Sequence, residues 1–147
     1  MKVLASLAVV SFVAAAAGAA DKPMKLRDLP AAVQKAIQEE TKGAVVKGYA
    51  EEKEDGKVFY EVETTRDGRA RDILFDPSGA LVSVEDEVTL ESIPAAARAA
   101  IEKAAAGGRI GMVEKVTEGG EVKYEAHVTK GAKKSEVVVT ADGSPAK

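Results

Sequence analysis

One segment of the chain occurs twice, 64 residues apart, and the two copies align without an insertion or deletion. Leu29-Pro30-Ala31-Ala32 recurs as Ile93-Pro94-Ala95-Ala96. The same offset pairs further positions: Ala36-Ile37 with Ala100-Ile101, Gly43 with Gly107, Gly56 with Gly120, Val58 with Val122, Tyr60-Glu61 with Tyr124-Glu125, Thr65 with Thr129, and Gly79 with Gly143. Pro, Gly, Tyr and an apolar pattern do not recur together by chance, so the sequence predicts two copies of one structural unit.

Each copy is predicted to begin with one helix. Asp28 and Ser92 are residue types that cap helix N-termini. Pro30 and Pro94 follow, in the first turn, where a missing N–H has no cost. Apolar residues then recur at helical spacing, so each helix is expected to bury one narrow stripe, and a glycine ends each helix.

Short strands with period-two alternation are predicted after each helix. The strand over 58–65 places apolar residues and Glu61 and Glu63 on opposite faces, and the strand over 122–129 does the same with Glu125 and His127. Asp55-Gly56 and Gly119-Gly120 predict hairpin turns before these strands. Third strands follow over 70–76 and 134–140, whereas a fourth, over 80–87, is complete only in the first copy.

The predicted fold class is therefore α+β, as two tandem repeats, each one helix packed on a three- to four-stranded antiparallel sheet. The expected domains are a signal peptide over 1–20, a first repeat over 21–88, and a second over 89–147 whose C-terminal strand is truncated. Six residues are predicted to anchor the repeats: Pro30, Ile37, Tyr60, Pro94, Ile101 and Tyr124.

The first 20 residues have the layout of a secretory signal. Lys2 precedes an uncharged run, and small residues end it, so cleavage is expected to leave Ala20 or Asp21 at the mature N-terminus. The alternative is a retained membrane anchor, but half of the 18 residues from Val3 to Ala20 are Ala or Gly. The predicted location is periplasmic or secreted, with no membrane span after signal cleavage.

The composition argues against most enzymes and against nucleic-acid binding. The chain has no Cys and one His, which excludes disulfides, thiolate chemistry and His-rich metal sites. Its 24 Asp and Glu exceed its 21 Lys and Arg, and only 4% of residues are aromatic, whereas nucleic-acid binding requires a basic surface and stacking rings. No nucleophile elbow or phosphate loop is present, so no catalytic residue and no cofactor are predicted.

Four residues are candidate metal ligands, although no metal site is predicted. Glu61 and Glu63 share a strand face, and Glu125 and His127 occupy the matching positions of the second copy. A carboxylate–imidazole pair could bind a divalent cation or act as acid and base. One His and scattered carboxylates lack metal-ligand spacing, so a solvated sheet face is the favoured interpretation.

Two kinds of charged cluster are further candidate sites. The acidic run at 85–87, with Glu91, lacks the Gly turn of a calcium loop and is interpreted as the charged end of an edge strand. Basic residues flank one hairpin of each copy and could contact an anionic partner, an envelope polymer or a lipid headgroup, or could simply be solvated hairpin tips. These residues are Arg66, Arg69 and Arg71, and Lys130, Lys133 and Lys134.

The sequence resembles the PepSY-like domain. The residues that carry the resemblance are Leu-Pro-x-x-Val-x-x-Ala-Ile from Leu29, the segments 56–62 and 73–81, and in the second copy Ile93-Pro94 and the segments 122–126 and 137–143. The resemblance covers almost all of the chain after the leader. It implies a bacterial secreted or envelope protein, a tandem arrangement like the beta-lactamase-inhibitor-protein fold, and a non-catalytic binding or inhibitory module.

The predicted function is an exported, non-enzymatic binding or inhibitor-type module that recognises an envelope protein or peptide. The alternative is a cation- or envelope-polymer-binding protein that uses the acidic strand face or the basic hairpins. The strand over 134–140 is apolar, and the remnant after it contains Pro145, which cannot donate a ladder hydrogen bond. Its edge is expected to pair with the first-copy sheet, with a second molecule in a homo-oligomer, or with an extended peptide.

Overall fold

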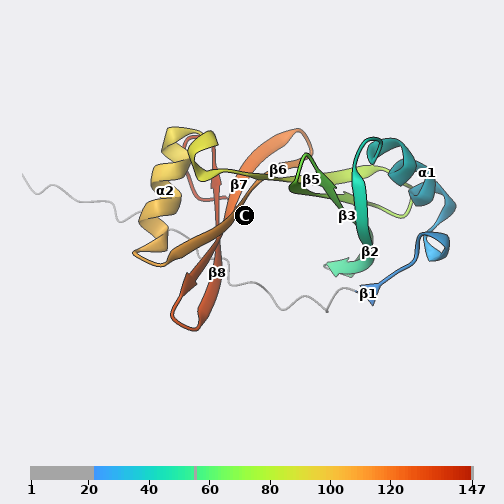
Figure 1. Cartoon of the computed structure of the whole chain (residues 1–147), viewed down its shortest axis with the longest axis horizontal. Helices are drawn as coiled ribbons and strands as arrows, with labels where there is room; N and C mark the ends of the chain where they lie inside the picture. Colours follow the sequence, from blue (N-terminus) through green and yellow to red (C-terminus); the bar gives the residue numbers. More distant parts are fainter. Residues whose placement is uncertain (1–21, 55, 147) are drawn as a thin grey trace, which may run out of the picture.

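The computed structural model describes residues 22–54 and 56–146 of the chain (Figure 1). The predicted signal peptide over 1–20 lies outside these residues, as does Asp55 of the first predicted hairpin turn. These residues form eight strands and two α-helices, with a short 3₁₀ helix before each α-helix. In chain order they are β1 (Lys22–Pro23), η1 (Leu26–Asp28), α1 (Ala31–Glu40), β2 (Val45–Glu54), β3 (Lys57–Arg66), β4 (Arg69–Phe75), β5 (Leu81–Val88), η2 (Leu90–Ser92), α2 (Ala95–Ala105), β6 (Arg109–Glu118), β7 (Glu121–Lys130) and β8 (Lys133–Thr140).

The predicted fold class is wrong, because the strands form one antiparallel sheet. They lie in the order β1 to β8, and the described residues are mostly strand rather than two helix-on-sheet repeats. The two halves join where β5 pairs with β6, from Ser83 opposite Glu118 to Val88 opposite Val113. Two separate sheets would each leave a row of unpaired backbone groups at this edge, and pairing β5 with β6 satisfies both rows.

The sequence correspondence nevertheless coincides with the element boundaries inside this one sheet. α1 and α2 begin 64 residues apart, at Ala31 and Ala95. The bounds of β2 and β6 differ by the same offset, and so do those of β3 and β7. The same local sequence therefore forms the same local structure twice, although the products share a single sheet.

The predicted helix caps are also wrong, by two residues. Asp28 lies in η1 and Ser92 in η2, whereas Pro30 and Pro94 are the N-cap residues of α1 and α2. A residue before proline is sterically pushed toward extended backbone, so Leu29 and Ile93, at ψ 156° and 162°, cannot continue the preceding turn into the helix.

Both helices cover the same face of the sheet, at opposite ends of the molecule (Figure 1). Residues of α1 pack with inward-facing residues of β3, β4 and β5, forming the first core cluster: Leu29, Val33, Ile37, Val62, Ile73, Phe75 and Val84. Residues of α2 pack with β6, β7 and β8, forming the second: Ile93, Ala97, Ile101, Ala104, Ala105, Val113, Ala126, Val128, Val137 and Val139. Val62, Ile73 and Val84 face one another across the ladder, as do Val113, Ala126 and Val137, which puts both clusters on the helix side.

Two matching glycines explain how each helix is held against the sheet. Gly79 and Gly143 have φ values of +82° and +83°, which disfavour any residue with a side chain. A Cβ at Gly79 would lie 2.7 Å from the Ala32 carbonyl oxygen, and one at Gly143 would lie 2.6 Å from that of Ala96. The turns therefore contact the first turn of each helix through backbone alone. Within the described residues, no helix is long and apolar enough to span a membrane.

Candidate functional site

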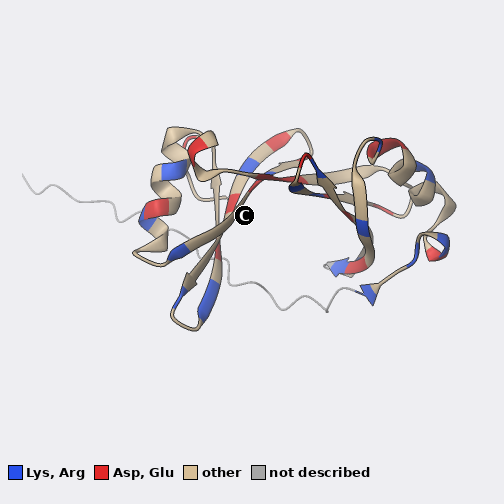
Figure 2. Ribbon diagram, viewed as in Figure 1, with Lys and Arg blue, Asp and Glu red and all other residues tan. Residues whose placement is uncertain are grey.

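The sheet face opposite the helices carries carboxylates on seven consecutive strands. Because side chains alternate between faces, the residues next to inward-facing Val62, Ile73 and Val84 point away from the helices. Glu63 lies opposite Asp72, and Asp72 opposite Glu85. We call this surface the acidic face, and Figure 2 shows acidic segments along the strands. Its carboxylates include Glu52, Glu61, Glu63, Asp72, Glu85, Glu87, Glu114, Glu118, Glu125 and Glu136.

Burial and repulsion between neighbours raise the pKa values of four carboxylates of the acidic face, Glu61, Asp72, Glu85 and Glu125. Burial, followed by repulsion from Glu52 and Asp72, raises the pKa of Glu61 to about 8. Burial, followed by repulsion from Glu114 and Glu125, raises the pKa of Glu85 to about 7. Each of these groups is therefore less stable as an anion here than in water, and a bound cation would relieve the repulsion.

A hollow of about 310 Å³ lies on the same face and reaches across strands β2 to β8. Apolar side chains and carboxylates both line it, together with Lys123, which lies 3.3 Å from Glu118. The lining residues are Glu52, Phe59, Leu74, Val82, Ser83, Glu85, Val116, Glu118, Lys123, Glu125 and Val138. The surface therefore offers an apolar contact area together with negative charge.

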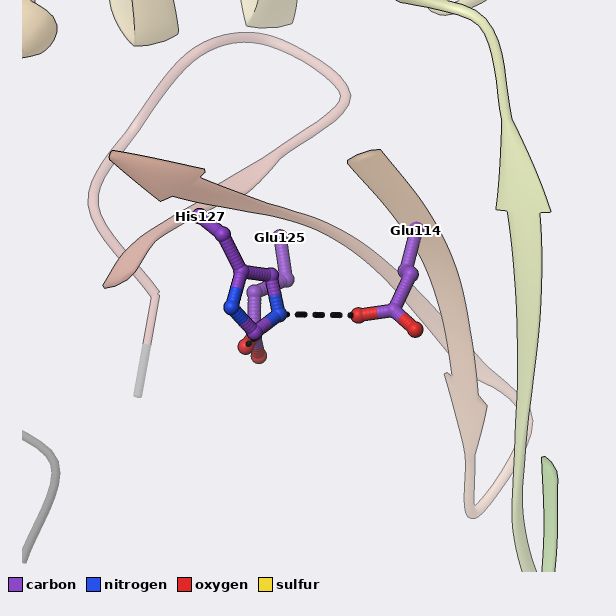
Figure 3. A group of neighbouring side chains, drawn as sticks. All are labelled: Glu114, Glu125 and His127. Atoms are coloured by element: carbon purple, nitrogen blue, oxygen red, sulfur yellow. Dashed lines mark hydrogen bonds and ion pairs between the residues drawn. The ribbon is translucent and has the colours of Figure 1, made fainter. Parts of the chain in front are cut away.

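A group of two carboxylates and one imidazole lies on β6 and β7, toward the C-terminal half of the acidic face (Figure 3). The His127 Nε2 atom lies 3.3 Å from Glu114 Oε2 and 3.7 Å from Glu125 Oε1. Only 4% of Glu114 is exposed. Burial, then Glu136 and Glu114, raises the pKa of Glu125, while His127 lowers it.

The structure brings together two of the four metal candidates and separates the other two. Glu125 and His127 lie in one group, whereas Glu61 and Glu63 are on β3, four strands away in the sheet. Glu61 lines a small pocket with Glu52, Asp72 and Glu85.

Glu114 was missed because it is far from Glu125 in sequence and its 64-residue equivalent, Ala50, is not acidic. The Gly119-Gly120 turn contains the signal that could have placed Glu114 beside Glu125. Counting back from that two-residue turn places Glu114 opposite Glu125.

The acidic run at 85–87 does not end an edge strand, so that interpretation is wrong. β5 lies inside the sheet, between β4 and β6. Alternation separates the three residues: Glu85 lines the hollow, Asp86 pairs with Arg71 at 2.7 Å on the helix side, and Glu87 accepts a hydrogen bond from the Ala70 N–H at 2.9 Å. Glu91 is exposed in η2.

Two residues of the basic hairpins hold the ends of the helices. Arg66 donates to the Lys42 carbonyl at 3.0 Å and the Glu40 carbonyl at 3.5 Å. Its equivalent, Lys130, donates to the Ala106 carbonyl at 3.2 Å. Cations at helix C-termini stabilise the terminal carbonyls, so these side chains have a structural role. Arg69 and Lys134 are exposed.

The remaining predicted positions lie in the core and at the sheet edge. Ile37 and Ile101 are buried, and Tyr60 and Tyr124 are partly buried against the two clusters. β8 is an edge strand and does not pair with the first half, so that predicted pairing is wrong. The C-terminal residues fold back on it, with Pro145 bridging Val139. Self-association through this edge stays a prediction.

The fold is similar to solved structures from Bacteroides. A protein assigned to the periplasm of Bacteroides eggerthii is 21% identical, with a TM-score of 0.67, and the match covers 81% of this chain and 86% of that one. A BLIP-like protein of Bacteroides fragilis is 21% identical, with a TM-score of 0.60 and coverage of 81% and 84%. A DUF2874 family protein of Bacteroides ovatus is 19% identical, with a TM-score of 0.63 and coverage of 81% and 85%.

These identities establish likeness of fold alone. The predicted resemblance to the beta-lactamase-inhibitor-protein fold is confirmed at that level by the BLIP-like structure. The location of the Bacteroides eggerthii protein agrees with the periplasmic or secreted location predicted from the leader. No family model and no curated protein matches the sequence, so the PepSY-like assignment gains no support from them.

Proposed function

We propose that the protein is an exported, non-enzymatic binding module that recognises a basic segment of an envelope protein or peptide through its acidic face. The observation that carries the proposal is the hollow on the helix-free face, which is lined by both apolar side chains and carboxylates. The leader and the periplasmic assignment of one structural neighbour support export. A PepSY-like origin and the absence of catalysis belong to the same proposal.

A basic partner fits the electrostatics of this surface. Lys or Arg brought near Glu61 and Glu85 would favour their ionised forms, so binding would release protons near neutral pH. Apolar partner side chains would at the same time cover Phe59 and Leu74 in the hollow. The basic hairpins are the weaker alternative, because Arg66 and Lys130 already hold helix ends.

The test uses residues 21–147 without a tag and a short peptide of alternating Lys and Leu, with a Glu–Leu peptide as control. We expect calorimetry to detect binding of the Lys–Leu peptide that weakens as salt is added. The variant E61Q/D72N/E85Q should bind at least about tenfold more weakly. The matched control E40Q/E91Q/E102Q replaces the same number of carboxylates at exposed helix-side positions and should bind like the wild type.

Equal losses in the two variants would show that net charge alone attracts the peptide. Failure of the wild type to bind the Lys–Leu peptide would contradict a basic-segment site. Export is tested separately, by N-terminal sequencing of protein from the periplasm or medium. We expect Ala20 or Asp21 as the first residue, and a chain that still begins with Met1 would contradict cleavage.

A further inference from the structure

Two carboxylates and one imidazole converge on the acidic face, at β6 and β7. The ligand atoms of Glu114, Glu125 and His127 all lie within 4.8 Å of one another. Figure 3 shows the His127 Nε2 atom directed toward the Glu114 carboxylate, with the Glu125 carboxylate overlapping the ring in this view. Donors about 2.0–2.1 Å from a tetrahedral ion lie about 3.4 Å apart. The separations of 3.3 and 3.7 Å from Nε2 are close to this value.

The burial of Glu114 is a second, independent observation. Its exposed fraction is 4%, and a buried carboxylate is costly unless it is paired. Within the described residues, its ion-pair partner is His127, whose side chain is 43% exposed. Glu87 lies directly opposite Glu114 on β5 and adds a further negative charge.

The fold itself does not require a carboxylate at this position. Ala50 occupies the equivalent place in the first half, opposite Glu61, just as Glu114 lies opposite Glu125. Ala50 is also buried, at 6% exposure. The same site of the same sheet is therefore filled by a methyl group in one half and by an acid in the other, so packing does not explain Glu114.

We propose that Glu114, Glu125 and His127 bind a divalent first-row transition ion, with Zn²⁺ as the representative. A mixed nitrogen and carboxylate set suits such ions, whereas Ca²⁺ and Mg²⁺ prefer oxygen ligands alone. Three protein ligands leave a fourth position for water or for a group of a partner. The site shares Glu125 with the hollow of the acidic face, but its ligand set lies on β6 and β7 alone and does not depend on the Lys- or Arg-binding role of that face.

The direct test titrates Zn²⁺ into tag-free residues 21–147. Because the chain has a single His, one set of imidazole NMR signals reports on His127 alone. We expect these signals to shift as one equivalent of Zn²⁺ binds and the thermal midpoint to rise, since an ion held by β6 and β7 stabilises the folded state. Ca²⁺ and Mg²⁺ should bind more weakly than Zn²⁺.

Three variants separate coordination from a structural role. H127E copies Glu63 of the first half and should weaken Zn²⁺ binding at least about tenfold while keeping the side chain polar. E114A copies Ala50 and should weaken it similarly without losing the fold. E125Q should also weaken it at least about tenfold, whereas the matched control E61Q, the equivalent change in the first half, should leave Zn²⁺ affinity unchanged.

Several outcomes would overturn the proposal. They are unshifted His127 signals at saturating Zn²⁺, equal affinity of H127E and the wild type, a loss in E61Q as large as that in E125Q, or tighter binding of Ca²⁺ than of Zn²⁺. Peptide binding is measured without metal, so failure of this site leaves the basic-segment proposal standing, and the reverse also holds.

Discussion

The two halves of the sheet share their scaffold but differ on the acidic face. Each has a helix that begins after proline, a buried Ile on that helix and a glycine turn against the helix N-terminus. On the acidic face the first half has Ala50, Glu61 and Glu63, whereas the second has Glu114, Glu125 and His127. The residues that hold the fold recur, and those with ligand chemistry diverge.

Comparison of the halves shows which features the fold itself explains. A feature present in both halves, such as Arg66 and Lys130 at the helix ends, is explained by the fold. A feature present in one half alone cannot be explained in that way, because the other half folds without it. The buried Glu114 belongs to the second kind, and it is the strongest sign that the halves have different roles.

The largest expected effect tests whether the halves fold together. Replacement of Ile37 or Ile101, each almost completely buried, by Ala should cost about 2 to 5 kcal/mol of the free energy of unfolding. Because β5 and β6 join the halves, each variant should still unfold in one transition, monitored by urea denaturation and hydrogen exchange. Two transitions, with only the mutated half weakened, would show that the halves are energetically independent.

The second prediction makes the first half resemble the second. A50E places a carboxylate at a buried position beside Glu61 and should destabilise the fold at pH 7 by about 2 to 4 kcal/mol. In A50E/E63H, which completes the ligand set, Zn²⁺ should restore part of this loss and a second equivalent should bind. The measurement is urea denaturation with and without Zn²⁺. A50E as stable as the wild type would mean that an unpaired buried acid is tolerated here, which would remove the argument from Glu114.

Local features of the sequence predicted local structure well. The alternation over 58–65 placed Val62 and Thr64 inward, and both are buried in β3. The sequence did not predict features that depend on pairing between distant strands. The charged run at 85–87 resembles a solvent-exposed end, but alternation directs its members to opposite faces of an interior strand. The β5–β6 pairing spans α2, and no local pattern encodes it.

Only the part of the candidate site that lies on one strand could be predicted from the sequence. Glu125 and His127 are two residues apart on one strand, so period-two alternation is enough to bring them together. Glu114 joins them only after the β6–β7 hairpin closes in one particular register. A single sequence shows which residue types are present. To predict which residues are neighbours on adjacent strands, the register between those strands must also be known.

The third prediction concerns pH and again compares matched acids. The folded pKa of Glu61 is raised from 4.5 to about 8, so its stabilising contribution is present below pH 4.5 and is lost as the pH rises toward 8. E61Q should therefore be more stable than the wild type at pH 8, with little gain in stability at pH 5. The expected gain at pH 8 is about 1 to 2 kcal/mol, because solvent screens the charge of this half-buried group. E125Q should gain less, because His127 lowers the pKa of Glu125. Denaturation at both pH values measures this, and equal gains would contradict the asymmetry.

The smallest expected effect compares the two helix ends. Arg66 is half-buried and donates to two carbonyls at the C-terminal end of α1, whereas Lys130 is exposed and donates to one carbonyl directly after α2. Cations at such ends contribute about 0.3 to 1 kcal/mol. R66M, which keeps an apolar stem, should therefore cost about 0.5 to 1 kcal/mol, and K130M about half as much, with both losses shrinking in high salt. The control K134M changes an exposed lysine of the same hairpin and should leave the free energy of unfolding unchanged. If K130M costs as much stability as R66M, the number of carbonyls that accept hydrogen bonds from the side chain does not set the strength of the cap.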